Sequence, residues 1–178
     1  MRWMWIDRVT ELQPRHKLVA VKNVSLAEEH LHDHFPAEPA RGLLASPVMP
    51  ASLIVEGCAQ TGGILVGHAE AFKHKVILAK VNKLQIDRDA TPGCTLRYTA
   101  IIERMDDMGA SVNCTIELFD FAKPEAGFAA IGSIALMFSH LDHNMGAAGQ
   151  AGQDFPAHNF VFGDAFKTLL RSSGYAVQ

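Results

Sequence analysis

Residues 51–70 read ASLIVEGCAQTGGILVGHAE, and this stretch decides the fold. Apart from Ser52, Glu56, Gln60 and Thr61, it is apolar or glycine nearly all round, which is typical of a helix enclosed on most sides. Two prolines stand just before it, where the first turn of a helix accepts them. Its glycines lower helix propensity by about 1 kcal/mol each, but they let a sheet approach the backbone closely. We therefore expect one long, enclosed helix here.

Strand patterns lie on both sides of this helix. Val and Leu are frequent before it, and after it the apolar residues alternate with polar ones at a period of two. The last strand is apolar on both faces, which predicts a central position in the sheet. The expected strands are 16–25, 76–86, 94–103, 110–118 and 128–140. A strand, one helix and then a meander predict an α+β fold, with a curved antiparallel sheet wrapped around the long central helix.

The chain changes character after about residue 141. Residues 144–153 are small and linker-like, and the spacing of Phe162, Phe166, Leu169 and Leu170 then predicts a short amphipathic helix that ends at Gly174. So short a helix is marginal alone, so we expect it to dock on the body or on a neighbouring subunit. The predicted division is a folded domain over 1–143 and a linker with a tail over 144–178.

Composition excludes several classes of protein. Sixteen basic and nineteen acidic residues give a net charge of −3, which does not favour nucleic acid or anionic lipid. The three cysteines form no CxxC pair, as expected of reduced thiols in the cytosol. The longest apolar run, 51–66, is shorter than the roughly 20 residues that span a bilayer, and Asp7 leaves no room for the core of a signal peptide. We expect a cytoplasmic protein that does not bind membranes.

The polar residues of the helix share one stripe. Ser52, Glu56 and Gln60 are spaced by four, so they project from one face. A carboxylate there is structural if a cation pairs with it, whereas an apolar pocket raises its pKa and makes it a proton donor near neutral pH. No Lys or Arg lies within one helical turn of Glu56. A glutamate that simply reaches water at the rim of the helix is the third interpretation.

A histidine-rich run, His30-Leu31-His32-Asp33-His34, precedes the helix. It is similar to the HxHxDH run of metallo-hydrolases but is one residue short, and no further ligand pattern supports it, so we expect no metal site. His34 is followed by prolines at 36 and 39, which fix the backbone beside its ring. Because histidine titrates near pH 6.5, it suits a base at neutral pH. The alternative is an ordinary exposed loop histidine.

Two segments together resemble the signature of the bacterial 3-hydroxyacyl-[acyl-carrier-protein] dehydratases. These are His34-Phe35-Pro36 and residues 47–60, which read PVMPASLIVEGCAQ. Further agreement lies at 6–9, 22–24 and 92–96, so the resemblance covers about residues 5–140. That family has the hot-dog fold, in which an antiparallel sheet wraps a helix, and this is the architecture that the periodicities predict.

The resemblance implies dehydration of a 3-hydroxyacyl thioester to the trans-2-enoyl thioester in fatty acid biosynthesis. His34 would take the proton from C2, and Glu56 would protonate the departing C3 hydroxyl. The N–H groups of Ala51 and Ser52, at the start of the helix, are placed to stabilise the enolate oxygen. Gln60 would orient Glu56. The remaining predicted substrate-binding residues are Phe35 and Pro36.

The same resemblance implies no metal or organic cofactor. It also implies an acyl carrier protein as partner and a site shared between two subunits, in a homodimer or a trimer of dimers. Carrier proteins are acidic, so a local basic face would suit them. The candidates for that face are Lys73, Lys75, Lys80, Lys83, Arg88 and Arg97. The alternative, with at least equal weight, is that these cations are simply scattered over the solvated surface.

Three departures from the family pattern keep alternatives open. Residues 40–47 form an insertion of about eight residues, Ala51 replaces a glycine, and Asp33 stands where glycine is common. An alanine at a positive φ would be strained, and a carboxylate beside His34 would weaken that base. A hot-dog acyl thioesterase and a non-catalytic acyl-thioester-binding protein are therefore the alternative functions, although retention of both His34 and Glu56 favours the dehydratase.

Overall fold

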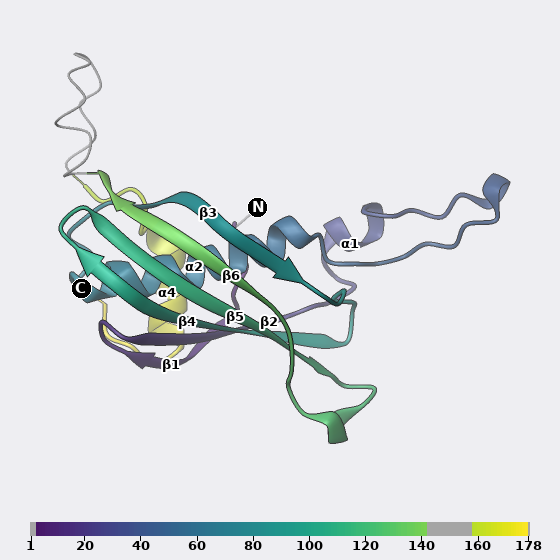
Figure 1. The fold of residues 1–178 in the computed structure, drawn as a ribbon. Coiled ribbons are helices and arrows are strands. Elements are labelled where there is room, and N and C mark those ends of the chain that lie inside the picture. Colours follow the sequence, from purple (N-terminus) through teal and green to yellow (C-terminus); the bar gives the residue numbers. More distant parts are fainter. Residues whose placement is uncertain (1–2, 142–157, 178) are drawn as a thin grey trace, which may run out of the picture.

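A computed structural model describes residues 3–141 and 158–177, and Figure 1 shows their arrangement. The elements are β1 (Arg8–Gln13), β2 (Lys17–Asn23), α1 (Glu29–Asp33), η1 (Pro39–Arg41), α2 (Ala51–Ala69), β3 (Val76–Ile86), β4 (Cys94–Asp106), β5 (Gly109–Asp120), η2 (Pro124–Ala126), β6 (Ala129–His140) and α4 (Asp164–Ser172). The long helix starts at the expected residue and ends one residue earlier than expected. The strand β1, the short helix α1 and the two 3-10 turns had no counterpart in the sequence-based prediction.

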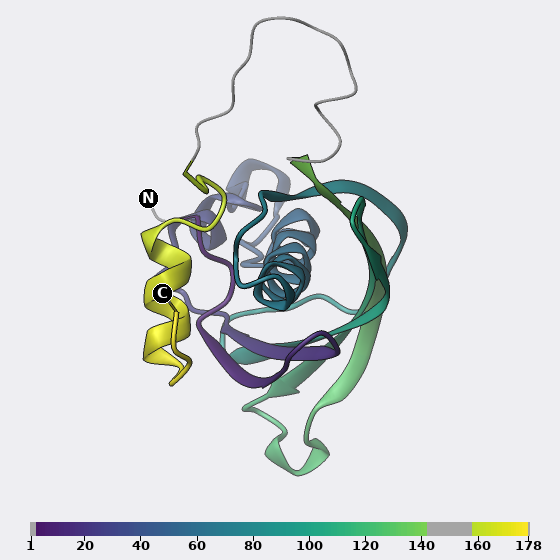
Figure 2. The same ribbon diagram turned by 90° about the vertical axis from the view of Figure 1, so that its left-hand side faces the viewer.

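The strands form one antiparallel sheet in the order β1-β2-β4-β5-β6-β3. This sheet curves around α2, as Figure 2 shows when viewed nearly along the helix. The predicted α+β hot-dog architecture is therefore confirmed. The interior position of the last strand is also confirmed, because β6 pairs with β5 and β3. Its two faces differ, however: Leu136 and Phe138 are buried, whereas Met137 between them is 42% exposed.

Glycines let the sheet come close to α2. The clearest case is Gly57, which lies against the ring of Tyr98 on β4. A Cβ atom at residue 57 would stand only 2.6 Å from ring atoms of that fully buried tyrosine. Because glycine has no side chain, a large aromatic ring can be buried directly against the helix backbone. The low helix propensity of glycine is the cost of this contact.

The C-terminal tail forms the expected helix and docks on the body of its own chain. Leu169 and Leu170 of α4 are buried, and the N–H of Val9 donates to Oγ of Ser173 at 3.0 Å. Before the helix, Nδ2 of Asn159 donates to the carbonyl oxygens of Phe72 and His74, both at 2.9 Å. The linker predicted over 144–153 and the division at residue 143 lie outside the described residues.

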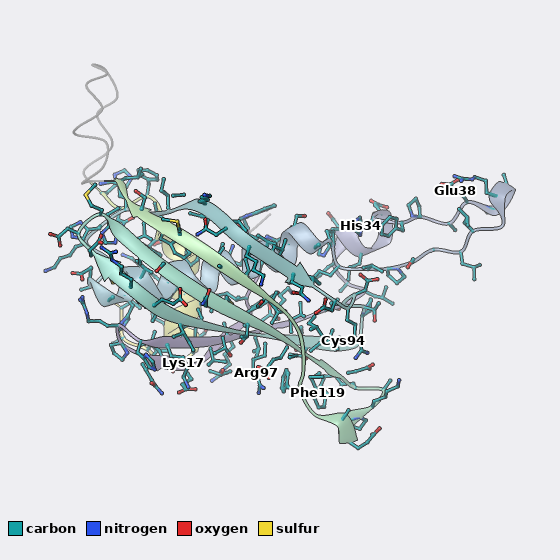
Figure 3. All side chains as sticks on the ribbon, viewed as in Figure 1. Lys17, His34, Glu38, Cys94, Arg97 and Phe119 are labelled. Atoms are coloured by element: carbon teal, nitrogen blue, oxygen red, sulfur yellow. The ribbon has the colours of Figure 1, made fainter. Side chains whose placement is uncertain are left out.

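Residues 35–46, which include most of the insertion, form an arm that projects from the body beyond α1, with Glu38 near its tip (Figures 1 and 3). Two backbone hydrogen bonds of 3.0 and 3.1 Å join Glu38 and Leu43 across the arm. A third bond, from Ser46 N to Phe35 O at 3.0 Å, closes its base. All of its side chains from 35 to 46 are exposed, including Leu44 at 89%. The insertion therefore leaves the rest of the fold intact.

Cys58, Cys94 and Cys114 are free and buried. Burial raises the pKa of the Cys58 thiol well above its ordinary value, so this sulfur is protonated. Within the described ranges, no helix combines the length and the apolar character needed to cross a bilayer.

Replacing Gly57 by alanine tests the close contact between helix and sheet. We expect Gly57→Ala to lower the free energy of unfolding, because overpacking costs roughly 1–3 kcal/mol and outweighs a propensity gain of about 1 kcal/mol. Gly63→Ala is the matched control, since its Cβ would lie 3.5 Å from the nearest atom, Cε1 of Phe138. That variant should gain about 0.5–1 kcal/mol. Denaturant unfolding measures both, and equal stability of the two variants would contradict the packing argument.

Candidate functional site

The polar stripe of α2 runs from solvent into the protein. Ser52 is exposed, Glu56 is half-buried, and Gln60 is only 5% exposed. Within the described part of the chain no Lys or Arg forms an ion pair with Glu56. The carboxyl group is therefore neither the anchor of a salt bridge nor fully in water.

The side chain of Gln60 fixes the position of Glu56. Its Oε1 accepts a hydrogen bond from the N–H of Trp5 at 2.8 Å, and its Nε2 donates to the carbonyl oxygen of Trp3 at 2.9 Å. Because a backbone N–H can only donate, this contact determines which end of the amide is oxygen. The NH₂ group must then face Glu56, to whose Oε1 it donates at 3.0 Å. One carboxyl oxygen is thus held, and the other is available for a proton.

Glu56 and Gln60 are the two polar residues in the lining of an otherwise apolar pocket of about 240 Å³. The pocket lies between α2 and strands β3 and β6. Its other lining residues are Ala59, Gly63, Ile64, Val76, Ile77, Leu78, Phe138, Val161, Phe162 and Phe166. The arrangement places a carboxyl group at the head of a space that suits an alkyl chain.

His34 caps the C-terminal end of α1 and is half-buried at the base of the arm. Its Nδ1 lies 2.7 Å from the carbonyl oxygen of Val48. Since a carbonyl oxygen only accepts, Nδ1 must carry the hydrogen, which leaves the lone pair of the neutral ring on Nε2. The imidazole is therefore held in the tautomer that a base acting through Nε2 requires.

The first residues of α2 present free backbone donors. The carbonyl oxygen of Pro50 accepts from the N–H groups of Leu53 and Ile54, at 2.9 and 3.3 Å. The N–H groups of Ala51 and Ser52 have no acceptor among the residues that the structure describes. They lie at the positive end of the helix dipole, where a developing negative charge is stabilised. The φ angle of Ala51 is not positive, so the backbone strain expected for an alanine in place of the glycine is absent.

Like His34, Ala51 and Ser52, the other expected residues do not line this pocket. Phe35 is 53% exposed, Pro36 is exposed, and neither lines the pocket that contains Glu56. Asp33 is exposed and forms no ion pair with His34 in the described structure. Within one chain no hydrogen bond joins His34 to Glu56: their partners are Val48 and Gln60.

Sequence reasoning missed two contributions to this region. The first is the N-terminal segment, whose backbone at Trp3 and Trp5 holds Gln60. The second is the tail, which brings Val161, Phe162 and Phe166 into the pocket. The spacing of the tail predicted a docked helix, but no local signal indicates where a docked helix lands.

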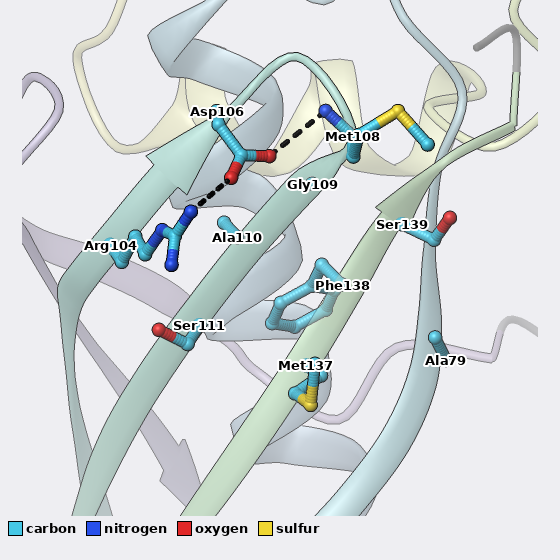
Figure 4. Close-up of a pocket in the computed structure, with 10 residues that line it drawn as sticks. All are labelled: Ala79, Arg104, Asp106, Met108, Gly109, Ala110, Ser111, Met137, Phe138 and Ser139. Carbon is cyan, nitrogen blue, oxygen red and sulfur yellow. Dashed lines mark hydrogen bonds and ion pairs between the residues drawn. The ribbon is translucent and has the colours of Figure 1, made fainter. Parts of the chain in front are cut away.

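Other hollows do not contain the candidate residues. Figure 4 shows one of about 540 Å³ beside the turn between β4 and β5, where Asp106 binds Arg104 and the N–H of Met108. Another, of about 710 Å³, is lined by Trp3, Met4, Trp5, Ala27, Glu28, Glu29, His30 and Leu53. Burial is the main cause that lowers the pKa of His30 there. Among the described residues, no three His, Cys, Asp or Glu side chains gather as metal ligands would.

Comparisons with known proteins identify the family of this chain. The model of the FabA-like domain matches residues 2–119. The 3-hydroxyacyl-[acyl-carrier-protein] dehydratase FabZ of Oceanobacillus iheyensis is 39% identical over 104 residues, which cover 58% of this chain and 69% of that protein. The protein of the same name from Listeria innocua is 36% identical over 118 residues, covering 65% and 76%.

Solved structures support the fold. The dehydratase heterocomplex ApeI:P from Xenorhabdus doucetiae matches with a TM-score of 0.59 at 13% identity, over 83% of this chain and 91% of that one. An acyl-CoA hydrolase from Agrobacterium tumefaciens matches with a TM-score of 0.53 at 12% identity, over 71% and 44%. Such low identities show the shared fold alone. The family model and the sequence relatives go further: this chain belongs to the FabA-like family, among the FabZ-type 3-hydroxyacyl-[acyl-carrier-protein] dehydratases.

Proposed function

We propose that this protein dehydrates 3-hydroxyacyl groups carried on acyl carrier protein to trans-2-enoyl groups in fatty acid biosynthesis. The observation that carries the proposal is the pair of fixed groups, a histidine held with Nε2 as its base and a glutamate held by Gln60 at the head of an apolar pocket. The relatives that match over most of their length are named dehydratases, so the thioesterase and the non-catalytic binder are not favoured.

The proposed reaction begins with removal of a proton from C2 by Nε2 of His34. Negative charge then develops on the thioester oxygen, where the N–H groups of Ala51 and Ser52 stabilise it. One such donor is typically worth about 2.7–4 kcal/mol in the transition state. Glu56 gives its proton to the C3 hydroxyl, which leaves as water while the C2–C3 double bond forms. His34 then releases its proton, Glu56 takes one up, and the enzyme is restored.

The proposed active unit is a homodimer, alone or in a trimer of dimers, with His34 and Glu56 of each site supplied by different subunits. Two features support this assembly. His34 and Glu56 share no hydrogen bond within one chain. In addition, β3 is an edge strand with partly exposed Leu78, Val81 and Leu84, and an exposed apolar edge is a template for pairing with another chain. We place the enzyme in the cytoplasm, where we expect it to act without nucleic acid, membrane or cofactor.

The expected basic face for the carrier protein needs a correction. Lys75 is buried, so it cannot contact a partner. Lys73 comes four residues after Ala69, the last residue of α2, which is about 27 Å from Ala51 along the helix at 1.5 Å per residue. Arg97 is engaged by Glu117 at 2.8 and 2.6 Å. Arg88 also pairs with an acid, Asp120 at 3.1 Å, but its side chain stays 48% exposed. It is the better candidate because it lies two residues before Ala90, whose carbonyl oxygen accepts from Met49 N just before α2.

Mixing two inactive variants tests the shared site. We expect His34→Ala and Glu56→Gln each to lower kcat at least 100-fold, the usual scale for losing an acid or base. When the two are unfolded and refolded together, half of the dimers are mixed, and each mixed dimer regains one intact site. Dehydration followed by enoyl absorbance should recover to about one quarter of the wild-type rate. Sites built within one subunit would give no recovery.

Replacing Gln60 tests its role as a positioning residue. Gln60→Leu removes the donor to Glu56, so we expect kcat to fall about tenfold or more while KM changes little. It also leaves the backbone of Trp3 and Trp5 without partners, at a cost of about 1–3 kcal/mol in stability. Thr61→Val is the matched control, because the buried hydroxyl of Thr61 bonds only to Gly57 O at 2.7 Å. A similar loss of kcat in both variants would mean that Gln60 is merely structural.

Charge reversal tests the carrier-protein contact. We expect Arg88→Glu to raise KM severalfold for a 3-hydroxyacyl group on carrier protein, because an acidic partner is then repelled. KM for the corresponding pantetheine thioester, which carries no net charge, should stay the same. Lys73→Glu makes the same charge change at the far end of α2 and should alter neither value. An equal rise for both substrates in Arg88→Glu would refute the contact.

A further inference from the structure

The tail of this chain contributes to the lining of the pocket that contains Glu56. The FabA-like match ends at residue 119, whereas Val161, Phe162 and Phe166 line the pocket from the far side of the sequence. These three side chains are therefore an addition to the matched domain. Together with Phe138 they form the aromatic part of the lining.

The pocket follows the axis of α2. Its helical lining residues, Glu56, Ala59, Gln60, Gly63 and Ile64, recur at spacings of three and four and so form one stripe. From residue 56 to residue 64 this stripe is about 12 Å long at 1.5 Å per residue. Glu56 lies at its N-terminal end and Gln60 at its middle, and all other lining residues are apolar or glycine.

Phe162 stands at the opposite end of this stripe. Its ring lies directly on the backbone of Gly67, where an added Cβ atom would be 2.5 Å from Cζ. The ring centroids of Phe72 and Phe166 lie 4.9 and 5.8 Å from that of Phe162, in edge-to-face contacts. This aromatic trio, Phe72, Phe162 and Phe166, packs at Gly67 beyond Ile64, and two of its members, Phe162 and Phe166, line the pocket.

The trio is held from both sides. Asn159 Oδ1 accepts from Val161 N at 3.1 Å and from Phe162 N at 3.4 Å, while its Nδ2 binds the two carbonyl oxygens around Lys73. On the other side, α4 buries Leu169 and Leu170 against the body. An aromatic trio anchored in this way has a defined position, so it can act as a plug that sets the length of a bound ligand.

We propose that Phe162 and Phe166 determine the length of the acyl chain that this enzyme accepts. The inference rests on the proposed function in one respect, namely that the acyl group enters at Glu56. The methyl end of the chain then points along α2 toward the aromatic trio. Each methylene that fits in an apolar pocket is worth about 0.8 kcal/mol, so a chain that collides with the plug loses this gain.

Shortening Phe166 tests the proposal. Phe166 is half-buried, so its removal disturbs the fold less than removal of the buried Phe162. We expect Phe166→Ala to raise kcat/KM for 3-hydroxyhexadecanoyl relative to 3-hydroxyhexanoyl thioester by about tenfold. Val177→Ala is the control, because Val177 belongs to the tail and packs on the core without lining the pocket. It should leave the ratio unchanged.

A binding measurement separates this inference from the proposed function. Calorimetry with saturated acyl-coenzyme A esters, from hexanoyl to hexadecanoyl, reports chain-length preference without turnover, and Phe166→Ala should shift the tightest binding to longer esters. If wild-type protein dehydrates no substrate, the proposed function fails while the binding series still tests the plug. If wild-type protein dehydrates and Phe166→Ala keeps its chain-length profile in both assays, the plug is refuted. Should Phe166→Ala not fold, Phe166→Leu must shift the profile in the same direction.

Discussion

The hydrogen bonds of one buried amide, that of Gln60, connect the parts on which this structure depends. The amide bonds the backbone at Trp3 and Trp5 on one side and Glu56 on the other. Because an unpaired buried polar group costs about 1–3 kcal/mol, the N-terminal segment and the helix hold each other in place through it. The orientation of the carboxyl group is thereby coupled to the folding of a segment about 55 residues away in sequence, and catalytic geometry and stability share the same contacts.

Most of the fold could be predicted from periodicity, and the exceptions have physical reasons. The mostly apolar run at 51–66 located α2, and the two-residue period located β4 and β5. Strand β1 was missed because a register shift between Val9 and Glu11 interrupts its alternation. Helix α1 was missed because five residues are too few to show a helical period. The apolar outer face of the last strand suggested burial on both sides, yet Met137 is partly exposed in the single chain.

The candidate site was predictable only where its chemistry is local in sequence. The spacing of Glu56 and Gln60 on one helix face implied their contact. The tautomer of His34, in contrast, depends on the carbonyl group of Val48, which the chain reaches only after the whole arm. Lys75 was grouped with exposed cations because composition says nothing of burial. The tail packs on Gly67 because the missing side chain there leaves room for the ring of Phe162, a contact across 95 residues that no local pattern indicates.

The glycines of α2 have two different roles, and the positions of these glycines explain why the helix contains several of them. At Gly57 the missing side chain admits Tyr98, which adds apolar burial where the sheet crosses the helix. At Gly67 the missing side chain admits Phe162. At Gly63 an added Cβ would lie 3.5 Å from the ring of Phe138, at ordinary contact distance, and this glycine lines the pocket. Two of these sites are filled by aromatic rings and one stays open to the pocket. The glycines lower the helix propensity of α2, but their missing side chains let aromatic rings pack on the helix and leave room for the pocket beside Glu56.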